Sequence, residues 1–279
     1  MSSAQEEREY VLGTGDDELR RLRLQHRLWS PTLQRLWDSA GFGPGMRFLD
    51  VGCGPGYMAF DLVDRFGRDC DVVGVDQSAR FIDYFRSETQ RLELGRVHPI
   101  VADVQTMGPA DGVDAVSFDA AYTRWVLCFT PDPAAAVQRV ADALKPGGRF
   151  LMQEYFNYRA LTPAPMSERF DVMREAIRKS WLDAGGNDDI GGELPRLCRQ
   201  AGLKVVSVEH IGAIARPGEA LWQWPTSYFE TFFPRLVESG YITETQRAEF
   251  MKEWDLRSRD PNAFFVVPPM VGVVAEKLA

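Results

Sequence analysis

The segment FLDVGCGPGYMAF, from Phe48 to Phe60, decides the fold. It reads as a short apolar strand, then glycines at alternate positions, then the start of a helix. Small residues let the backbone come close to a ligand, and the first turn of a helix presents free N–H groups. A plain turn would not need three glycines, because each one costs chain entropy. The segment therefore predicts a strand–loop–helix unit that holds a nucleotide-like ligand.

The spacing of the glycines bears on which cofactor the loop holds. From Asp50 onward the pattern is Asp-x-Gly-x-Gly-x-Gly, with Gly52, Gly54 and Gly56. A dinucleotide-binding fingerprint requires GxGxxG, and its last position here is Tyr57. A nicotinamide-dependent oxidoreductase is therefore the weaker alternative.

Strand and helix signals alternate on both sides of this segment. The expected strands are Arg47–Gly52, Asp71–Asp76, Val97–Asp103, Phe118–Tyr122 and Arg149–Phe156. A helix is expected from Pro131 to the Lys145-Pro146-Gly147-Gly148 stop. Such alternation is typical of βαβ units, so residues 45–156 are expected to form a parallel, doubly wound α/β sheet.

The flanking regions predict further helices and two more strands. Residues 16–40 are expected to form two short helices divided at Ser30-Pro31, and residues 166–184 a third. Lys204–Ile211 and Phe264–Glu276 read as strands, and a capping box starts at Thr243 in the helical stretch between them.

Composition narrows the class of protein. Of the 279 residues, 45% are apolar and 26% charged, and the four cysteines are spread singly. No apolar run is long enough to span a membrane, and the N-terminus has no signal-peptide pattern. The net charge of −8 disfavours a nucleic-acid partner, which needs many Lys and Arg. We expect a soluble, cytoplasmic protein with reduced thiols.

Two carboxylates follow later strands of the expected sheet. Asp76 lies twenty residues beyond Gly56, where an acidic residue of a doubly wound fold reaches the cofactor ribose. The alternative is an N-cap for the helix near Ser78. Asp103 can accept a hydrogen bond from an adenine amino group, or it can simply form a turn.

These residues resemble class I methyltransferases that depend on S-adenosylmethionine. The segments LDVGCGPG, VVGVDQS, ADV, FDAAYTRWVL and ALKPGGRFLMQE are similar to the ordered motifs of that family. The likeness is greatest to the ubiquinone- and menaquinone-biosynthesis type and to relatives in natural-product pathways. It implies the strand order 3-2-1-4-5-7-6, with the seventh strand antiparallel.

The resemblance also implies which residues bind S-adenosylmethionine. Asp50, Gly52, Gly54 and Gly56 would surround the methionyl portion, Asp76 and Gln77 the ribose, and Asp103 and Val104 the adenine. Thr123 and Arg124 would lie near the methionyl end and the acceptor. Tyr10 would close over the cofactor as part of an N-terminal helical cap, residues 1–44, on a Rossmann-like domain, residues 45–279. In the same cap, Gln25 or His26 would face the acceptor. Helical insertions are expected at about 160–190 and 217–260.

The acceptor must be inferred from other residues, because this chemistry has no universal catalytic motif. The chain lacks the motif for amino groups of DNA bases, the Pro-Cys pair for cytosine, and carboxylates for a metal after strand four. Aromatic residues are dense between Trp222 and Phe233. We expect Trp125, Trp222, Trp224 and Phe229 to form an acceptor pocket, although residues at helical spacing here can also be core.

A general base is needed only if the acceptor loses a proton. His26 lies on an apolar stripe with Leu19, Leu22 and Trp29, and it is a candidate base or a core residue. Glu154 and Tyr155, at the end of strand five, are the other candidates.

The sequence thus predicts a metal-independent methyltransferase of a small aromatic or planar metabolite, acting through O, N or C. A protein that only binds S-adenosylmethionine is the non-catalytic alternative. Exposed lid helices are compatible with a homodimer.

Overall fold

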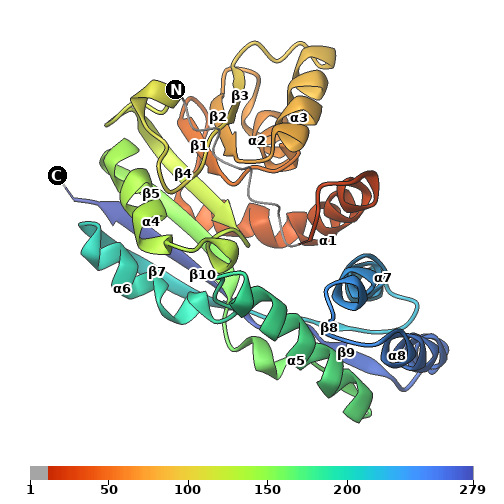
Figure 1. The fold of residues 1–279 in the computed structure, drawn as a ribbon. Coiled ribbons are helices and arrows are strands. Elements are labelled where there is room, and N and C mark those ends of the chain that lie inside the picture. Colours follow the sequence, from red (N-terminus) through yellow and green to blue (C-terminus); the bar gives the residue numbers. More distant parts are fainter. Residues whose placement is uncertain (1–11, 279) are drawn as a thin grey trace, which may run out of the picture.

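The computed structural model describes residues 12–278, so Tyr10 lies outside the described residues. A seven-stranded sheet has the order β3-β2-β1-β4-β5-β10-β7 (Figure 1). Strand β10 is antiparallel to both of its neighbours, whereas the pairs from β3 to β5 are parallel. The predicted fold class and strand order are confirmed. The strands are β1 Arg47–Val51, β2 Asp71–Asp76, β3 Val97–Val101, β4 Phe118–Arg124, β5 Leu144–Tyr155, β7 Leu203–Ile211 and β10 Met270–Lys277.

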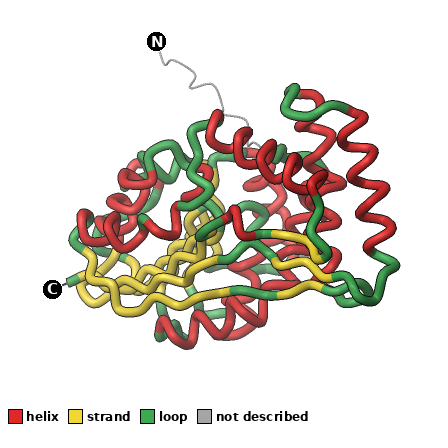
Figure 2. The backbone as a smooth tube through the Cα atoms, turned by 90° about the horizontal axis from the view of Figure 1, so that it is seen from below, coloured by secondary structure: helices red, strands yellow, loops and turns green. Residues whose placement is uncertain are grey.

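Helices cover both faces of this sheet (Figure 2). Helix α1 packs on α2 and β5, whereas α4 packs on α6 and β5. The helices around the sheet are α1 Asp16–Ala40, α2 Tyr57–Phe66, α3 Ala79–Arg91, α4 Pro133–Ala143 and α6 Leu194–Gln200. Short 3₁₀ helices are η1 Pro109–Asp111, η2 Leu127–Phe129, η3 Tyr158–Ala160, η4 Ile190–Gly192 and η5 Ala220–Trp222.

The remaining helices and a small sheet form a lid group beyond β5 (Figure 1). Helix α7 packs on α1, α5 and α8. The small sheet has the order β6-β9-β8, and the sequence analysis did not foresee it. The lid group consists of α5 Glu168–Asp183, α7 Gln223–Glu238, α8 Glu244–Arg257, β6 Thr162–Ala164, β8 Ile214–Ala215 and β9 Phe264–Val266.

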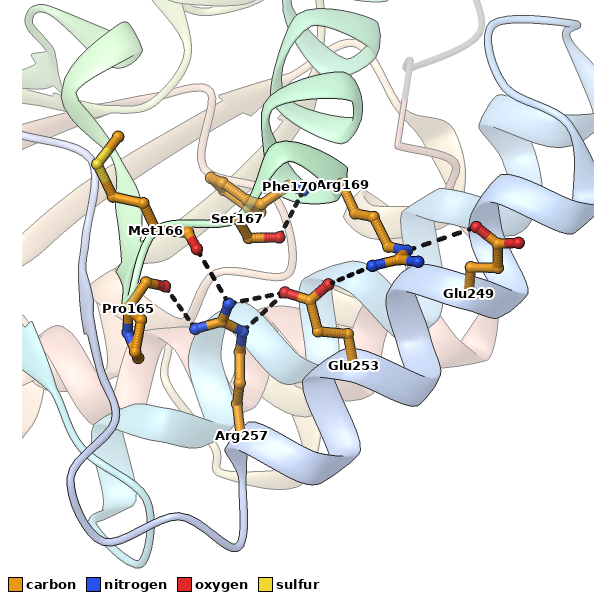
Figure 3. A network of polar contacts seen from close by, with 8 residues as sticks. All are labelled: Pro165, Met166, Ser167, Arg169, Phe170, Glu249, Glu253 and Arg257. Atoms are coloured by element: carbon orange, nitrogen blue, oxygen red, sulfur yellow. Dashed lines mark hydrogen bonds and ion pairs between the residues drawn. The ribbon is translucent and has the colours of Figure 1, made fainter.

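A polar network joins α8 to the segment that enters α5 (Figure 3). Arg257 donates to the carbonyl oxygens of Pro165 at 2.5 Å and Met166 at 3.4 Å, and it pairs with Glu253 at 2.7 Å. Arg169 of α5 pairs with the same Glu253 at 3.4 Å. These contacts connect two lid segments that lie far apart in the sequence.

Two local predictions were wrong. Residues 16–40 form one helix with Pro31 inside it, not two helices. An interior proline costs roughly 3 kcal/mol, but the helix buries Trp29, Leu33 and Leu36 on one face, and this burial outweighs the local cost. The expected strand Phe264–Glu276 is two strands, because Pro268 and Pro269 cannot donate to a ladder. The capping box at Thr243 is confirmed.

Candidate active site

A cavity of about 1020 Å³ opens at the carboxyl ends of β1, β2, β3 and β4, beneath α1. Eight of the residues that the sequence predicted for cofactor binding converge on it. Those that line it are Asp50, Gly52, Gly54, Asp76, Gln77, Asp103, Val104 and Arg124. The edge of the sheet therefore brings together side chains from four strand ends, as expected for a doubly wound fold.

Each of the three loop positions is glycine for a different physical reason. All have left-handed backbone angles, with φ of 69° at Gly52, 52° at Gly54 and 79° at Gly56. A Cβ at Gly52 would lie 2.3 Å from Val126, and one at Gly56 would lie 2.2 Å from Phe85. Only Gly54 would place a Cβ in open space. Packing therefore requires two of the glycines, and the predicted approach of a ligand to the backbone at Gly54 stays a prediction.

Asp76 fixes the shape of the loop as well as lining the cavity. Its Oδ2 accepts from the Gly54 N–H at 2.8 Å, and its Oδ1 accepts from the Ser78 N–H at 2.8 Å. Burial raises the pKa of Asp76, and the two backbone hydrogen bonds oppose that rise. The N-cap of α3 is Ser78, whose Oγ accepts from the Phe81 N–H at 3.3 Å. Asp76 is therefore not the cap, and its predicted contact with a ribose stays a prediction.

Two opposite charges in the cavity each have an unsatisfied atom. Asp50 Oδ2 and Arg124 Nη1 are buried and have no hydrogen-bond partner within residues 12–278. Burial raises the pKa of Asp50 to about 7, and the positive charge of Arg124 opposes this rise. A buried charged group without a partner is costly. The pair therefore suits a ligand that presents a cation to Asp50 and an anion to Arg124.

Helix α1 places His26 in the wall of the same cavity. Its Nε2 lies 3.0 Å from Asp61 Oδ2, and its Nδ1 lies 3.1 Å from Arg124 Nη2. A guanidinium only donates, so Nδ1 accepts and Nε2 carries the proton that Asp61 accepts. Burial lowers the pKa of His26, which agrees with this neutral form.

Two predicted cofactor residues lie outside the lining. Thr123 is buried, and its Oγ1 donates to the Val51 carbonyl oxygen at 3.0 Å, which ties β4 to β1. Gly56 packs against Phe85. Their roles at the cofactor stay predictions.

A second, narrow cavity of about 40 Å³ adjoins the first, and we call it the aromatic chamber. Its rings come from the loop after β4, from β5 and the η3 turn that follows it, and from the lid group. They include Trp125, Tyr155, Tyr158, Trp181, Trp224, Tyr228 and Phe229. Trp125, Phe129 and Gln25 line both cavities, so these residues form the boundary between them.

Trp125 is held in an unusual backbone conformation at this boundary. Its φ is 54°, and a non-glycine residue in that region is strained. Its ring stacks on Tyr155 at 5.7 Å and on Trp224 at 5.6 Å, and its Nε1–H donates to Met270 Sδ at 3.2 Å. Many contacts therefore determine where this ring stands.

Glu154 holds the loop that follows Trp125. Its Oε1 accepts from the Val126 and Leu127 N–H groups, both at 2.8 Å. The side chain is fully buried and lines neither cavity, whereas Tyr155 lines the aromatic chamber. Burial raises the pKa of Glu154 to about 7. A catalytic role for either residue stays a prediction.

The predicted acceptor residues separate into two groups. Trp125, Trp224 and Phe229 line the aromatic chamber. Trp222 lines neither cavity and stacks on Trp254 with ring centroids 4.4 Å apart, and its Nε1–H donates to Ser258 Oγ at 2.9 Å. Its contacts are those of a packed lid residue, and its predicted role in binding has no support from this placement.

Helix α1 carries a buried polar stripe, of which Glu18 and Arg21 were not predicted from the sequence. Gln25 was expected to face the acceptor, and it lines both cavities. Glu18, Arg21 and Gln25 are buried and continue the face that carries Trp29 and Leu33. Arg21 pairs with Glu18 at 2.6 Å, and Gln25 Oε1 accepts from Trp224 Nε1–H at 2.8 Å. The i, i+3, i+7 spacing leading into Trp29 was the available signal, but a search for apolar stripes passes over polar members.

In the part of the chain that the structure describes, no cluster of three or more His, Cys, Asp or Glu side chains could hold a metal ion. No described helix has the length and apolarity needed to cross a membrane.

A family model described as a methyltransferase domain matches residues 42–202. The chain belongs to this family. The O-methyltransferase cnsE of Penicillium expansum is 29% identical over 180 residues, which are 64% of this chain and 59% of that protein. The chain spans 56% to 59% of the lengths of three curated relatives that it matches.

Solved structures share the fold of this methyltransferase-family chain at low identity. The geranyl diphosphate C-methyltransferase from Streptomyces coelicolor A3(2), in complex with geranyl diphosphate and S-adenosyl-L-homocysteine, is 18% identical, with a TM-score of 0.56 over 91% of this chain and 80% of that one. The [4+2]-cyclase SpnF is 17% identical, with a TM-score of 0.57 over 88% of this chain and 79% of that one. These likenesses concern the fold alone.

Proposed function

We propose that this chain transfers the methyl group of S-adenosylmethionine to a small, flat and largely apolar acceptor. The observation that carries the proposal is a pair of buried, unsatisfied atoms, Asp50 Oδ2 and Arg124 Nη1, on two residues that line the large cavity. The methionyl end of the cofactor carries both an ammonium and a carboxylate, so it offers each of these atoms a partner of opposite charge. Family membership supports the same cofactor.

The residues of this chain would then act mainly by alignment. Asp50 and Arg124 would hold the methionyl end, Asp76 the ribose, and Asp103 with Val104 the adenine. Bound S-adenosylmethionine would supply a methyl group activated by its positive sulfur, and its transfer would leave S-adenosylhomocysteine. Holding the acceptor in line with that methyl group can supply ~7–11 kcal/mol of the barrier.

We place the acceptor in the aromatic chamber, because Trp125, Phe129 and Gln25 border both cavities. Stacked rings favour a flat, apolar ligand. The chamber has about 40 Å³ of free space, so the acceptor must separate rings that now touch, such as Trp125 and Trp224. Of the two candidate bases on β5, Tyr155 is the one that can reach an acceptor placed there.

A second candidate function is a reaction of the acceptor without methyl transfer. The observation that favours it is the similar fold of a [4+2]-cyclase. A family fold can carry different chemistry on the same scaffold. In this case the chain would bind its substrate in the aromatic chamber, but no methyl group would move.

Two experiments test the proposal. In calorimetry, S-adenosylhomocysteine should bind, NADH should not, and Asp50→Asn and Arg124→Met should each weaken binding by about 10-fold or more. Labelled S-adenosylmethionine should then transfer its methyl group to a compound in a metabolite extract. Binding of NADH would contradict the cofactor assignment, and binding of S-adenosylhomocysteine without any methylated product would favour the second candidate.

A further inference from the structure

We infer that His26 is a positioning residue that orients Arg124 toward the cofactor. Asp61 fixes the imidazole ring through its other nitrogen, Nε2. The inference rests on the proposed function, since it assumes that the large cavity binds S-adenosylmethionine. It assigns His26 a role other than the proton acceptor that its sequence position predicted. The three residues come from α1, α2 and the end of β4, so no local sequence pattern links them.

The hydrogen bonds of His26 leave it no free lone pair with which to take a proton from the methyl acceptor. Arg124 Nη2 lies 3.1 Å from Nδ1, and because an arginine can only donate, the Nδ1 lone pair is occupied. Nε2 then carries the proton, 3.0 Å from Asp61 Oδ2. Asp61 Oδ2 also accepts from Ser30 Oγ at 2.6 Å, which fixes the carboxylate. A ring held in this way orients a neighbour and cannot take up a proton without breaking a contact.

The orientation of the Arg124 guanidinium matters because its second terminal nitrogen, Nη1, is the atom that would meet the cofactor. Arg124 Nη1 is buried and has no partner among the described residues, and the side chain lines the large cavity. The guanidinium lies over the Trp125 ring, with Cζ 5.1 Å from the centroid. A long side chain that is fixed before binding loses less entropy on binding. His26 thus prepares Arg124 to meet an anionic group, and it links the α1 cap to the floor of the cavity.

Protonation of His26 should disturb this arrangement. An imidazolium Nδ1–H would point at the Arg124 guanidinium, and the two cations would repel each other. The charged or titratable groups around the ring are Asp61 and Tyr57 of α2 and Arg124 of β4, with Asp50 beyond Arg124. Asp50 also titrates, so a pH effect on binding is assigned to His26 only where it differs between the wild type and a His26 variant.

Two substitutions separate positioning from proton transfer. Asn can present an oxygen near the place of Nδ1 and accept from Arg124, but it cannot act as a base, whereas Leu can do neither. We expect His26→Leu to weaken S-adenosylhomocysteine binding by about 10-fold and His26→Asn by no more than about 3-fold, as measured by calorimetry. Turnover should follow the same order. His210→Leu, on the exposed face of edge strand β7, is the matched control and should leave both unchanged.

Two further measurements keep the test decisive. Nitrogen-15 NMR of the labelled wild-type protein without ligand should show His26 neutral with its proton on Nε2. If His26→Leu does not fold, Asp61→Ala replaces it, because Asp61 is partly exposed, and it should also weaken binding, by about 3-fold.

The outcomes separate this inference from the proposed function. A wild-type protein that does not bind S-adenosylhomocysteine would refute the proposed function. Wild-type binding with equal affinity in His26→Leu would refute only the role of His26. A His26→Asn variant that binds normally but loses turnover as completely as His26→Leu would show that His26 is the base after all. A proton on Nδ1 in the NMR experiment would also overturn the inference.

Discussion

The glycine loop and the aromatic chamber are the two halves of the site that we propose, but they are built in different ways. The loop is a single stretch of chain between β1 and α2, and its shape follows from left-handed glycines and one carboxylate, Asp76. The chamber takes its walls from α1, the loop after β4, β5, α5 and α7. A half built from consecutive backbone residues can be recognised in the sequence as a motif. A half built from side chains of distant segments shows in the sequence only as residue composition.

The largest expected effect contrasts two tryptophans that the sequence predicted for acceptor binding, only one of which lines the aromatic chamber. Trp222 is packed on Trp254 away from both cavities, so Trp222→Ala should cost about 3–5 kcal/mol of unfolding free energy, measured in urea. The acceptor KM of the folded fraction should not change. Trp125→Ala should raise that KM by about 10-fold, because the ring borders the chamber. A raised acceptor KM in stably folded Trp222→Ala would place the acceptor elsewhere.

Within the glycine loop, a matched pair separates packing from ligand approach. Gly56→Ala places a Cβ 2.2 Å from Phe85 in a left-handed backbone, so it should lower the unfolding free energy by about 2–5 kcal/mol. Gly54→Ala meets no atom within 4 Å and should cost only about 1–2 kcal/mol, yet weaken S-adenosylhomocysteine binding. Gly45→Ala, also left-handed and uncrowded, measures the backbone cost alone. Equal losses of stability at Gly54 and Gly56 would contradict this division.

Glu154 holds the loop after β4, and its burial predicts a pH effect on stability. Its pKa is raised to about 7, so the folded state keeps a proton that the unfolded state loses at ~4.3. The stabilisation by the neutral acid is complete below about pH 4 and is lost as the pH rises through about 7.

Glu154→Gln isolates this effect, because the amide oxygen can still accept from the Val126 and Leu127 N–H groups and cannot ionise. Relative to the wild type, the variant should gain up to about 3 kcal/mol between pH 5 and pH 8, measured by urea unfolding at each pH. A wild-type-minus-variant difference that does not depend on pH would mean that Glu154 does not titrate in this range.

The smallest expected effect concerns the lid surface. Arg257→Ala removes contacts to Pro165, Met166 and Glu253 and should cost about 1 kcal/mol, whereas Arg169→Ala should cost less, about 0.3 kcal/mol (Figure 3). Thermal unfolding in low salt measures both. A larger loss for Arg169 would indicate that the network is held together from α5 and not from α8.

The sequence by itself determined the sheet. The strand–glycines–helix unit, the alternation of strands and helices, and the carboxylates after the strands are local patterns, and the strand order that their family resemblance implied is the observed one. They also placed Asp50, Asp76 and Asp103 at one edge, because parallel strands end together. The local pattern was wrong at Pro31, where it predicted a break between two helices. Burial along the whole of α1 outweighs the cost of this helix-breaking residue.

Only the tertiary structure decided which contacts the side chains around the two cavities make. Packing of α1 on α7 buries Glu18, Arg21 and Gln25, polar residues that no apolar pattern selects. Arg124, 98 positions along the chain, occupies the Nδ1 lone pair of His26, so the ring faces a donor. Glu154 is turned toward the loop after β4 and not into either cavity. Hydrogen-bond direction and burial depend on atoms from distant segments, and the fold must be complete before those atoms meet.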